Sequence, residues 1–169
     1  TMYSPAYPSY YDGITNYAEV TDEKAYSGNY SVKIAAPSCT GYQRILTSNL
    51  SAQPGEYEVS LYARGNFDRE LMWVQAGPSG VSGEVTLSLN DLKSVASDKD
   101  GWYKYAGTMN LTKGTSRLDI ITIGSVNMLY IDDVSLTKAG EQNNLLVNGG
   151  FEQNKLVNKK TLANVIAYP

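Results

Sequence analysis

The stretch Glu56-Tyr-Glu-Val-Ser-Leu-Tyr-Ala-Arg64 decides the fold of this chain of 169 residues. Its apolar positions alternate, so that Tyr57, Val59, Leu61 and Ala63 point one way and the residues between them point the other. This period of two residues is the signature of a β-strand with one buried face. No sustained period of 3.6 residues, which would indicate an amphipathic helix, occurs in the chain.

Segments of the same kind occur on both sides of this stretch, with turn-forming residues between them. We expect strands at Tyr30–Ile34, Tyr42–Thr47, Glu70–Ala76, Val85–Leu89, Trp102–Leu111, Arg117–Ile123 and Met128–Thr137. About eight to ten short strands at this spacing predict an all-β fold, an antiparallel β-sandwich of the jelly-roll type. Only Leu89–Ser97 is interpreted as a short helical turn, capped by Asn90 or Asp91.

The chain divides into three parts. We expect residues 1–16 to form an arm rich in Tyr and Pro, and residues 17–138 to form the sandwich. Residues 139–169 begin with a polar linker, and a fresh apolar segment, Asn144–Glu152, follows it. We interpret this segment as the opening strand of a following module. The alternative is a strand donated to a neighbouring copy of the chain, which would close an open sheet edge.

Composition excludes several classes of function. The chain has 14 Lys and Arg against 17 Asp and Glu, so it lacks the basic excess that nucleic-acid binding needs. Histidine is absent and Cys39 is the single cysteine, which excludes Ser-His-Asp and Cys-His catalysis, zinc sites and an internal disulfide. No apolar run is as long as the roughly 18 residues that a membrane-spanning helix needs. We therefore expect neither nucleic acid nor a membrane as partner.

Four segments are the most distinctive of the chain: Ala25–Ile34 (AYSGNYSVKI), Pro54–Arg64 (PGEYEVSLYAR), Asp100–Tyr105 (DGWYKY) and Leu129–Leu136 (LYIDDVSL). In this order they resemble the jelly-roll carbohydrate-binding modules of bacterial glycoside hydrolases, the superfamily that includes families 4, 9, 16 and 22. Such modules normally open with a strand similar to Asn144–Glu152, which here stands near the opposite end of the sequence.

The resemblance implies a non-catalytic module, secreted or at the cell surface, that binds a polysaccharide or an oligosaccharide. A β-linked glucan, a xylan or a mannan is the expected ligand. The alternative is a structural subunit of an extracellular filament, tube or surface layer, assembled from neighbouring copies by strand donation and calcium. Glycosidase chemistry needs two carboxylates facing one cleft. The available Glu56, Glu58, Asp68 and Glu70 lie on outward strand positions or loops, so we expect no enzyme activity.

The ligand face is expected on a concave sheet, where aromatic rings stack on sugar rings and amide or charged groups bond the hydroxyls. The residues expected to contact the ligand are Tyr42, Gln43, Arg44, Arg69, Trp73, Gln75 and Asp119, with Thr122 beside them. In the stretch 69–76, Arg69, Trp73 and Gln75 share one face and the apolar residues share the other. The alternative for Trp73 is a half-buried structural side chain, and Trp102 is assigned to packing against the core.

The pair Asp132-Asp133 is the sharpest polar feature of the sequence. Adjacent strand residues point to opposite faces, so only one carboxylate can turn inward, where it needs a partner. The resemblance implies that this partner is a structural Ca²⁺, an ion that takes six to eight oxygen ligands. Asp133 is the preferred ligand, and the other candidates are Asp132, Asp22, Glu23, Ser27, Asn29 and Glu152. The alternative is that both aspartates cap backbone groups or face solvent.

Overall fold

The computed structural model describes residues 2–3, 18–37, 42–47, 50–77, 85–146 and 148–152, with side chains left out for 2–3, 42–44 and 46–47. The elements are β1 (Met2–Tyr3), β2 (Ala18–Thr21), β3 (Ser31–Ala36), β4 (Tyr42–Thr47), β5 (Gly55–Asn66), the 3₁₀ turn η1 (Arg69–Leu71), β6 (Met72–Gly77), β7 (Val85–Ser88), η2 (Leu89–Asp91), β8 (Lys93–Ala96), β9 (Tyr103–Leu111), β10 (Arg117–Ile123) and β11 (Val126–Lys138). The predicted arm and the end of the chain therefore lie mostly outside the described residues.

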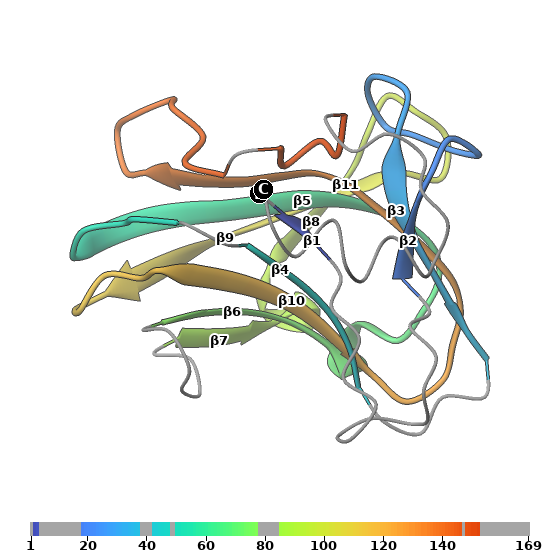
Figure 1. Ribbon diagram of the computed structural model, residues 1–169, viewed down its shortest axis with the longest axis horizontal. Helices are drawn as coiled ribbons and strands as arrows, with labels where there is room; N and C mark the ends of the chain where they lie inside the picture. The colour runs from blue at the N-terminus through green and yellow to red at the C-terminus, as the bar shows by residue number, and fades with distance from the viewer. Residues whose placement is uncertain are drawn as a thin grey trace.

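Two antiparallel sheets pack face to face in the described part of the chain (Figure 1). One sheet has the strand order β1-β4-β10-β6-β7, and the other has the order β2-β3-β11-β5-β9-β8. The turn η2 carries the chain from β7 at the edge of the first sheet to β8 at the edge of the second. This all-β sandwich confirms the predicted fold class. No helix in the described ranges has the length and apolar character needed to cross a membrane.

The core lies between the two sheets, and the alternation read in the sequence decides which side chains enter it. Along β5, Tyr57, Val59, Leu61 and Ala63 are all buried, as the alternating stretch predicts. The opposite sheet contributes Met72, Val74 and Ala76 from β6 and Leu118 and Ile120 from β10. Burial of these apolar faces is the main favourable term that holds two sheets together.

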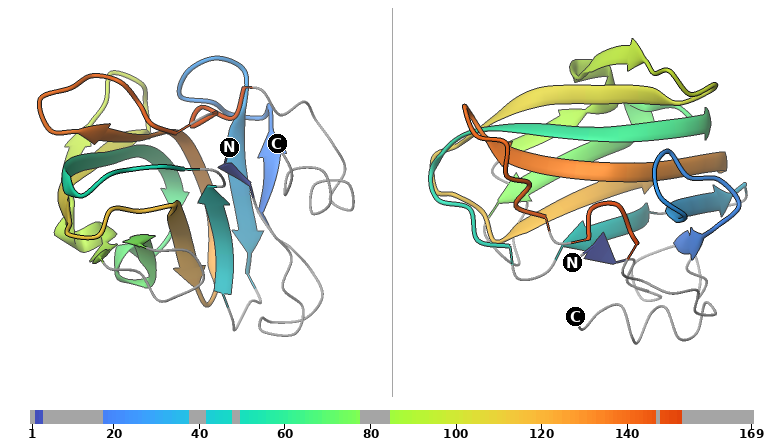
Figure 2. Two further views of the ribbon diagram at one scale, coloured as in Figure 1. Left: turned by 60° about the vertical axis from the view of Figure 1, so that its left-hand side comes forward. Right: turned by 90° about the horizontal axis from the view of Figure 1, so that it is seen from above.

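The second half of β11 is completed by the chain itself. β3 pairs with β11 only over Val126–Ile131, which leaves the backbone groups further along that edge without a strand. The chain turns back after β11, and the N–H of Val134 donates to the carbonyl of Gly149 at 2.9 Å. The side-chain oxygen of Asn144 accepts from the N–H of Leu136 at 3.0 Å. Figure 2 shows this returning segment beside β11.

The returning segment also enters the hydrophobic core. Leu146 is 6 % exposed and Phe151 is fully buried, and both belong to the core cluster of this sandwich. Residues 144–146 and 148–152 thus lie in their own sandwich, which differs from both sequence interpretations. Neither a following module nor a neighbouring copy is needed to satisfy this edge of β11. The position of this segment in the sequence therefore no longer supports the alternative of a structural subunit assembled by strand donation.

Candidate functional site

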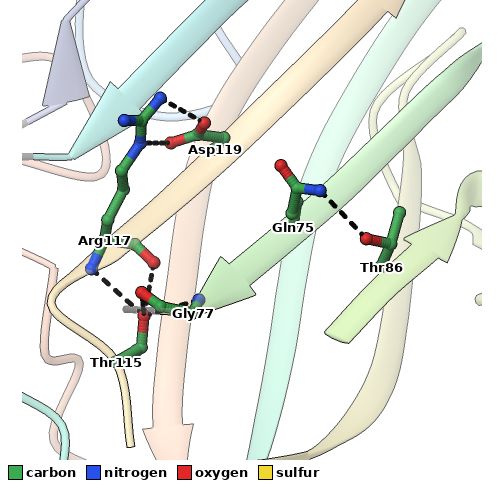
Figure 3. A network of polar contacts seen from close by, with 6 residues as sticks. All are labelled: Gln75, Gly77, Thr86, Thr115, Arg117 and Asp119. Carbon is green, nitrogen blue, oxygen red and sulfur yellow. Dashed lines mark hydrogen bonds and ion pairs between the residues drawn. The ribbon is translucent and has the colours of Figure 1, made fainter. Parts of the chain in front are cut away.

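The outer face of β6 carries the aromatic and amide pair expected from the sequence. Trp73 and Gln75 are half-buried there, on the side away from the core. Gln75 Nε2 donates to Thr86 Oγ1 on the neighbouring strand β7 at 3.1 Å (Figure 3). In the other direction β10 lies beside β6, and Asp119 stands across from Gln75 and Ile121 across from Trp73.

Asp119 forms a partly buried ion pair on the same face. Arg117 Nε and Nη2 donate to its two carboxylate oxygens at 2.6 and 2.7 Å (Figure 3). Such a bidentate pair is the strongest form of charged hydrogen bond and fixes the guanidinium plane. Asp119 is only 3 % exposed, so its carboxylate positions Arg117 rather than presenting itself to solvent. Sequence reasoning missed Arg117, although a residue two positions before Asp119 on a strand lies on the same face.

The Thr115 hydroxyl group fixes the start of β10 against the end of β6. Thr115 Oγ1 accepts from the N–H of Gly77 at 2.8 Å and from the N–H of Arg117 at 3.1 Å. It also lies within 2.7 Å of the Gly77 carbonyl oxygen, to which it can donate its proton (Figure 3). A single buried hydroxyl therefore satisfies backbone groups of both strands and fixes the place from which the Arg117 side chain extends.

Arg69 does not share a strand face with Trp73, and this prediction is wrong. Asp68 Oδ1 accepts from the N–H of Glu70 at 2.9 Å and starts the 3₁₀ turn η1, so that β6 begins only at Met72. The alternation counted from Arg69 therefore has no strand to follow. Arg69 is exposed at the end of the sandwich instead.

Thr122 does not belong to the outer face either. It is 2 % exposed and stands across from the core residue Met72. The register places Arg44 across from Ile121 and Gln43 across from Thr122. The side chains of Tyr42, Gln43 and Arg44 lie outside the described part of the chain, so their expected contacts with a ligand stay predictions.

A shallow depression of about 700 Å³ lies at the end of the sandwich. It is lined by Asn66, Phe67, Asp68, Arg69, Glu70 and Asn90. These residues come from the end of β5, from η1 with the loop before it, and from η2. The strands β6 and β7 lie between η1 and η2 in the sequence. This depression could not be predicted from the sequence, because its residues share no motif.

Asp132 and Asp133 both reach the turn that joins β2 to β3, which the alternation rule did not predict. Asp132 Oδ2 accepts from the N–H groups of Tyr26 and Ser27 at 2.7 and 3.1 Å. Ser27 Oγ donates to Asp133 Oδ2 at 2.7 Å. The cause is a break in the register between Asp132 and Ser135, with Asp133 at a φ of 44°. The break turns Asp133 away from the core position that strict alternation would give it.

Glu152 meets the same turn from the returning C-terminal segment. Its carboxylate accepts from the N–H of Asn29 at 3.0 Å and from the N–H of Tyr30 at 2.8 Å. Gly28 makes this approach possible, because a Cβ at that position would lie 2.5 Å from Glu152 Cδ. Three carboxylates from two distant parts of the chain thus surround residues 26–30. The resemblance led us to expect all three in one place.

The remaining metal candidates behave differently. Glu23 is held by Lys33 Nζ at 2.9 Å and by the hydroxyl of Tyr130 at 2.8 Å, and the hydrogen bond to Lys33 lowers its pKa. Asp22 is exposed. Ser27 and Asn29 donate their N–H groups to carboxylates. Glu23 therefore already has a cationic partner, unlike the carboxylates around residues 26–30, for which no ion pair with Lys or Arg is found among the described residues.

Of the three acidic side chains around residues 26–30, that of Asp132 is the fully buried one. Complete burial raises its pKa from 3.8 to about 7, and the negative charge of Asp133 adds to that rise. The backbone N–H groups of Ser27, Asp133 and Tyr26 act in the opposite direction, because they favour the charged form. The carboxylate and carbonyl oxygens around residues 26–30 are of the kind that a hard cation binds. The carbonyl of Tyr26 already accepts a hydrogen bond from the ammonium group of Lys99. In the described ranges, however, no three acidic side chains gather closely enough to hold a metal alone.

An aromatic cluster fastens this turn to the outside of the second sheet. The ring of Tyr26 stacks on Tyr62 with a centroid distance of 3.7 Å, and it meets Trp102 edge to face at 6.0 Å. Trp102 is 3 % exposed but lies outside the core cluster, because it stands on the opposite face from Tyr105. Its expected structural role is therefore kept, while its expected place against the core is wrong.

Comparison with known proteins gives a fold and no sequence family. No protein-family model matches the sequence, and no curated protein is similar to it. Among solved structures, the C-terminal family 22 carbohydrate binding module of Clostridium thermocellum Xyn10B matches 84 % of this chain and 88 % of its own, with 14 % identity and a TM-score of 0.50. A xylan-binding domain of the same family matches with 14 % identity, coverage of 84 % and 89 %, and a TM-score of 0.50.

A third match is the enzymatically active domain of tailspike protein 4 of bacteriophage CBA120, with 12 % identity and a TM-score of 0.51. The match covers 82 % of this chain and 19 % of the tailspike chain. The fold thus defines the chain as a jelly-roll β-sandwich. This is the fold of the two family 22 carbohydrate-binding modules, as the sequence motifs predicted, and it also occurs within the tailspike chain.

Proposed function

We propose that this chain is a non-catalytic module that binds a polysaccharide outside the cell or at its surface. The observation that carries the proposal is the outer face of β6, β7 and β10. There the half-buried ring of Trp73 lies on the same strand face as the Gln75–Thr86 hydrogen bond, next to the Arg117–Asp119 pair. The chain shares its fold with a carbohydrate binding module and with a xylan-binding domain, which supports the same class of ligand here.

The chemistry of this face matches that of a sugar ring. A pyranose presents an apolar C–H face that can pack on an aromatic ring, and a rim of hydroxyls that need donors and acceptors. Trp73 supplies the ring, Gln75 supplies an amide, and Arg117 supplies donors held in place by Asp119. Asp119 thus acts by orienting Arg117. A β-linked glucan, xylan or mannan, whose rings repeat along an extended chain, is the proposed ligand.

Affinity electrophoresis and calorimetry against xylan, β-glucan and mannan test the proposal. Trp73→Ala should weaken binding of the ligand by about tenfold or more, because it removes the apolar contact area of the ring. Tyr103→Ala is the matched control, since Tyr103 is 45 % exposed on the other sheet. Correctly folded protein that binds none of the three polymers, or binding that Trp73→Ala leaves unchanged, contradicts the proposal.

The absence of catalysis is part of the same proposal. Hydrolysis of a glycosidic bond needs two carboxylates in one cleft. Asp68 and Glu70 do line one depression, but Asp68 is engaged in capping η1. Incubation of the protein with xylo-, gluco- and mannohexaose, followed by mass spectrometry, should show intact hexaoses. Shorter products that disappear in the Glu70→Gln variant would contradict this part of the proposal.

We further propose that a calcium ion binds beside residues 26–30. Asp133 and Glu152 would supply carboxylate oxygens, and backbone carbonyls of the turn and water would supply the rest. The ion would neutralise a group of carboxylates that now rely on backbone N–H bonds. Millimolar CaCl₂ should raise the melting temperature of protein pretreated with EDTA. Asp133→Asn should abolish that rise, while Asp100→Asn, on an exposed turn, should keep it. No calcium-dependent rise in the unchanged protein contradicts this proposal.

A further inference from the structure

The depression at the end of the sandwich is separate from the face of Trp73. It is lined by Asn66 and Phe67, by Asp68–Glu70 and by Asn90. None of the residues of the Trp73 face lines it. At about 700 Å³ it has the size of a site for a small molecule, and it is open enough to receive the end of a longer one.

The residues of the depression favour one class of ligand. Two carboxylates, on Asp68 and Glu70, stand against the single guanidinium of Arg69, so a phosphate or another polyanion would be repelled. The walls are mostly polar, and therefore a purely apolar ligand would gain little. The amides of Asn66 and Asn90 each offer both donors and an acceptor. A neutral ring that carries several hydroxyl groups satisfies all of these conditions.

Phe67 gives the depression one fixed apolar wall. Its ring is half-buried, packs against the core and meets Tyr105 edge to face with centroids 6.4 Å apart. The ring is therefore held in place by the sandwich and is not a free loop side chain. An aromatic ring at the side of a polar depression can contact the apolar C–H face of a sugar while the amides bond its hydroxyls.

The walls are also fastened to each other before any ligand binds. Ser88 Oγ donates to the carbonyl of Arg69 at 3.1 Å, which joins the start of η2 to η1. Ser88 and Asp91 form a capping box that holds η2. Asp68 holds η1 in the same way. Because little loop ordering remains to be done, a small ligand loses less free energy on binding here than in a mobile loop.

We infer that this depression is a second carbohydrate site, which takes the terminal sugar of an oligosaccharide or polysaccharide between Phe67, Asn66 and Asn90. Arg69 and Glu70 line the same site and complete its set of donors and acceptors. The inference rests on the proposed function for the class of ligand, but it concerns a different place on the molecule. A chain end can enter such a depression, whereas the Trp73 face is proposed to bind a continuous chain.

Nuclear magnetic resonance titration of labelled protein distinguishes the two sites. The probes are the bioses and hexaoses of the xylo, gluco and manno series. We expect at least one biose to shift the backbone amide signals of residues 66–70 and Asn90, in the unchanged protein and equally in Trp73→Ala. The double variant Asn66→Ala/Asn90→Ala should weaken this biose binding about tenfold or more, because it removes two hydrogen-bonding amides. Asn110→Ala, on β9 beside the opposite end of β5, is the matched control.

Each of the other outcomes contradicts either the second site, the proposed Trp73 face, or both. If sugars shift only the signals of the Trp73 face, the second site is wrong and the proposed function stands. If sugars shift only the signals of the depression, the proposed face is wrong and the second site stands. If no probe shifts either set, both are wrong. If CaCl₂ shifts the depression signals and no sugar does, the depression is a cation site and the inference is overturned.

Discussion

Phe151→Ala tests whether residues 144–152 belong to the sandwich of their own chain. Phe151 is fully buried in the core, so its removal leaves a cavity lined by the core side chains. Truncation of a buried Phe costs about 3–5 kcal/mol. Alanine keeps the positive φ of 62° at this position, so no large new backbone strain is added to that cost. For a domain of this size, the loss corresponds to a melting temperature lower by about 6–20 °C.

The assay is thermal and urea unfolding at several protein concentrations. Val95→Ala, at an exposed position on β8, should stay within about 0.5 kcal/mol of the unchanged protein. The loss for Phe151→Ala should not depend on concentration, because the segment and its core belong to one chain. A loss below about 0.5 kcal/mol would refute the reasoning. So would a melting temperature of the unchanged protein that rises with concentration while that of Phe151→Ala does not, since this indicates docking on a neighbouring copy.

Three further substitutions probe the site and its supports. Gly28→Ala places a Cβ against the Glu152 carboxylate and should cost about 1–3 kcal/mol, whereas Gly140→Ala, at a similar positive φ in open space, reports the backbone part alone. The buried carboxyl of Asp132 has a raised folded-state pKa of about 7, so its protonated form stabilises the fold. With EDTA present, the free energy of unfolding should fall as the pH rises from 5 to 8, and Asp132→Asn should remove that fall. Thr115→Val should cost about 1–3 kcal/mol by leaving two backbone N–H groups without their acceptor, and Thr115→Ser should restore most of it.

The strands could be predicted wherever alternation and turn residues agreed. The expected bounds Tyr42–Thr47 and Arg117–Ile123 are those of β4 and β10, and the alternating stretch lies inside β5. The start of β6 could not be predicted in the same way. There the side chain of Asp68 caps a 3₁₀ turn, which competes with the strand conformation. The alternation of apolar and polar residues does not reveal such a cap. β8, whose side chains are all exposed, has no buried face to reveal it.

The site was predictable only to the level of residue types and faces. Trp73 and Gln75 could be placed together because they lie two positions apart on one strand. The buried state of Asp119 depends on Arg117 and on the position of β10 at the centre of its sheet, which no local pattern contains. The contact of Asp132 with Tyr26 joins residues more than a hundred positions apart. Only the resemblance to a family, and not any periodicity, could bring that region together before the structure did.

Docking of the C-terminal segment and cation binding beside residues 26–30 should be coupled. Phe151 anchors the segment in the core, and the next residue, Glu152, places its carboxylate on the turn. Any cation that binds Glu152 therefore binds the docked state better than the detached one, and linkage requires that docking strengthen cation binding equally. The stabilisation by CaCl₂ should consequently be smaller in Phe151→Ala than in the unchanged protein, and unaltered in Val95→Ala. Equal stabilisation in all three would show that the segment and the ion act independently, and would remove Glu152 from the proposed ligands.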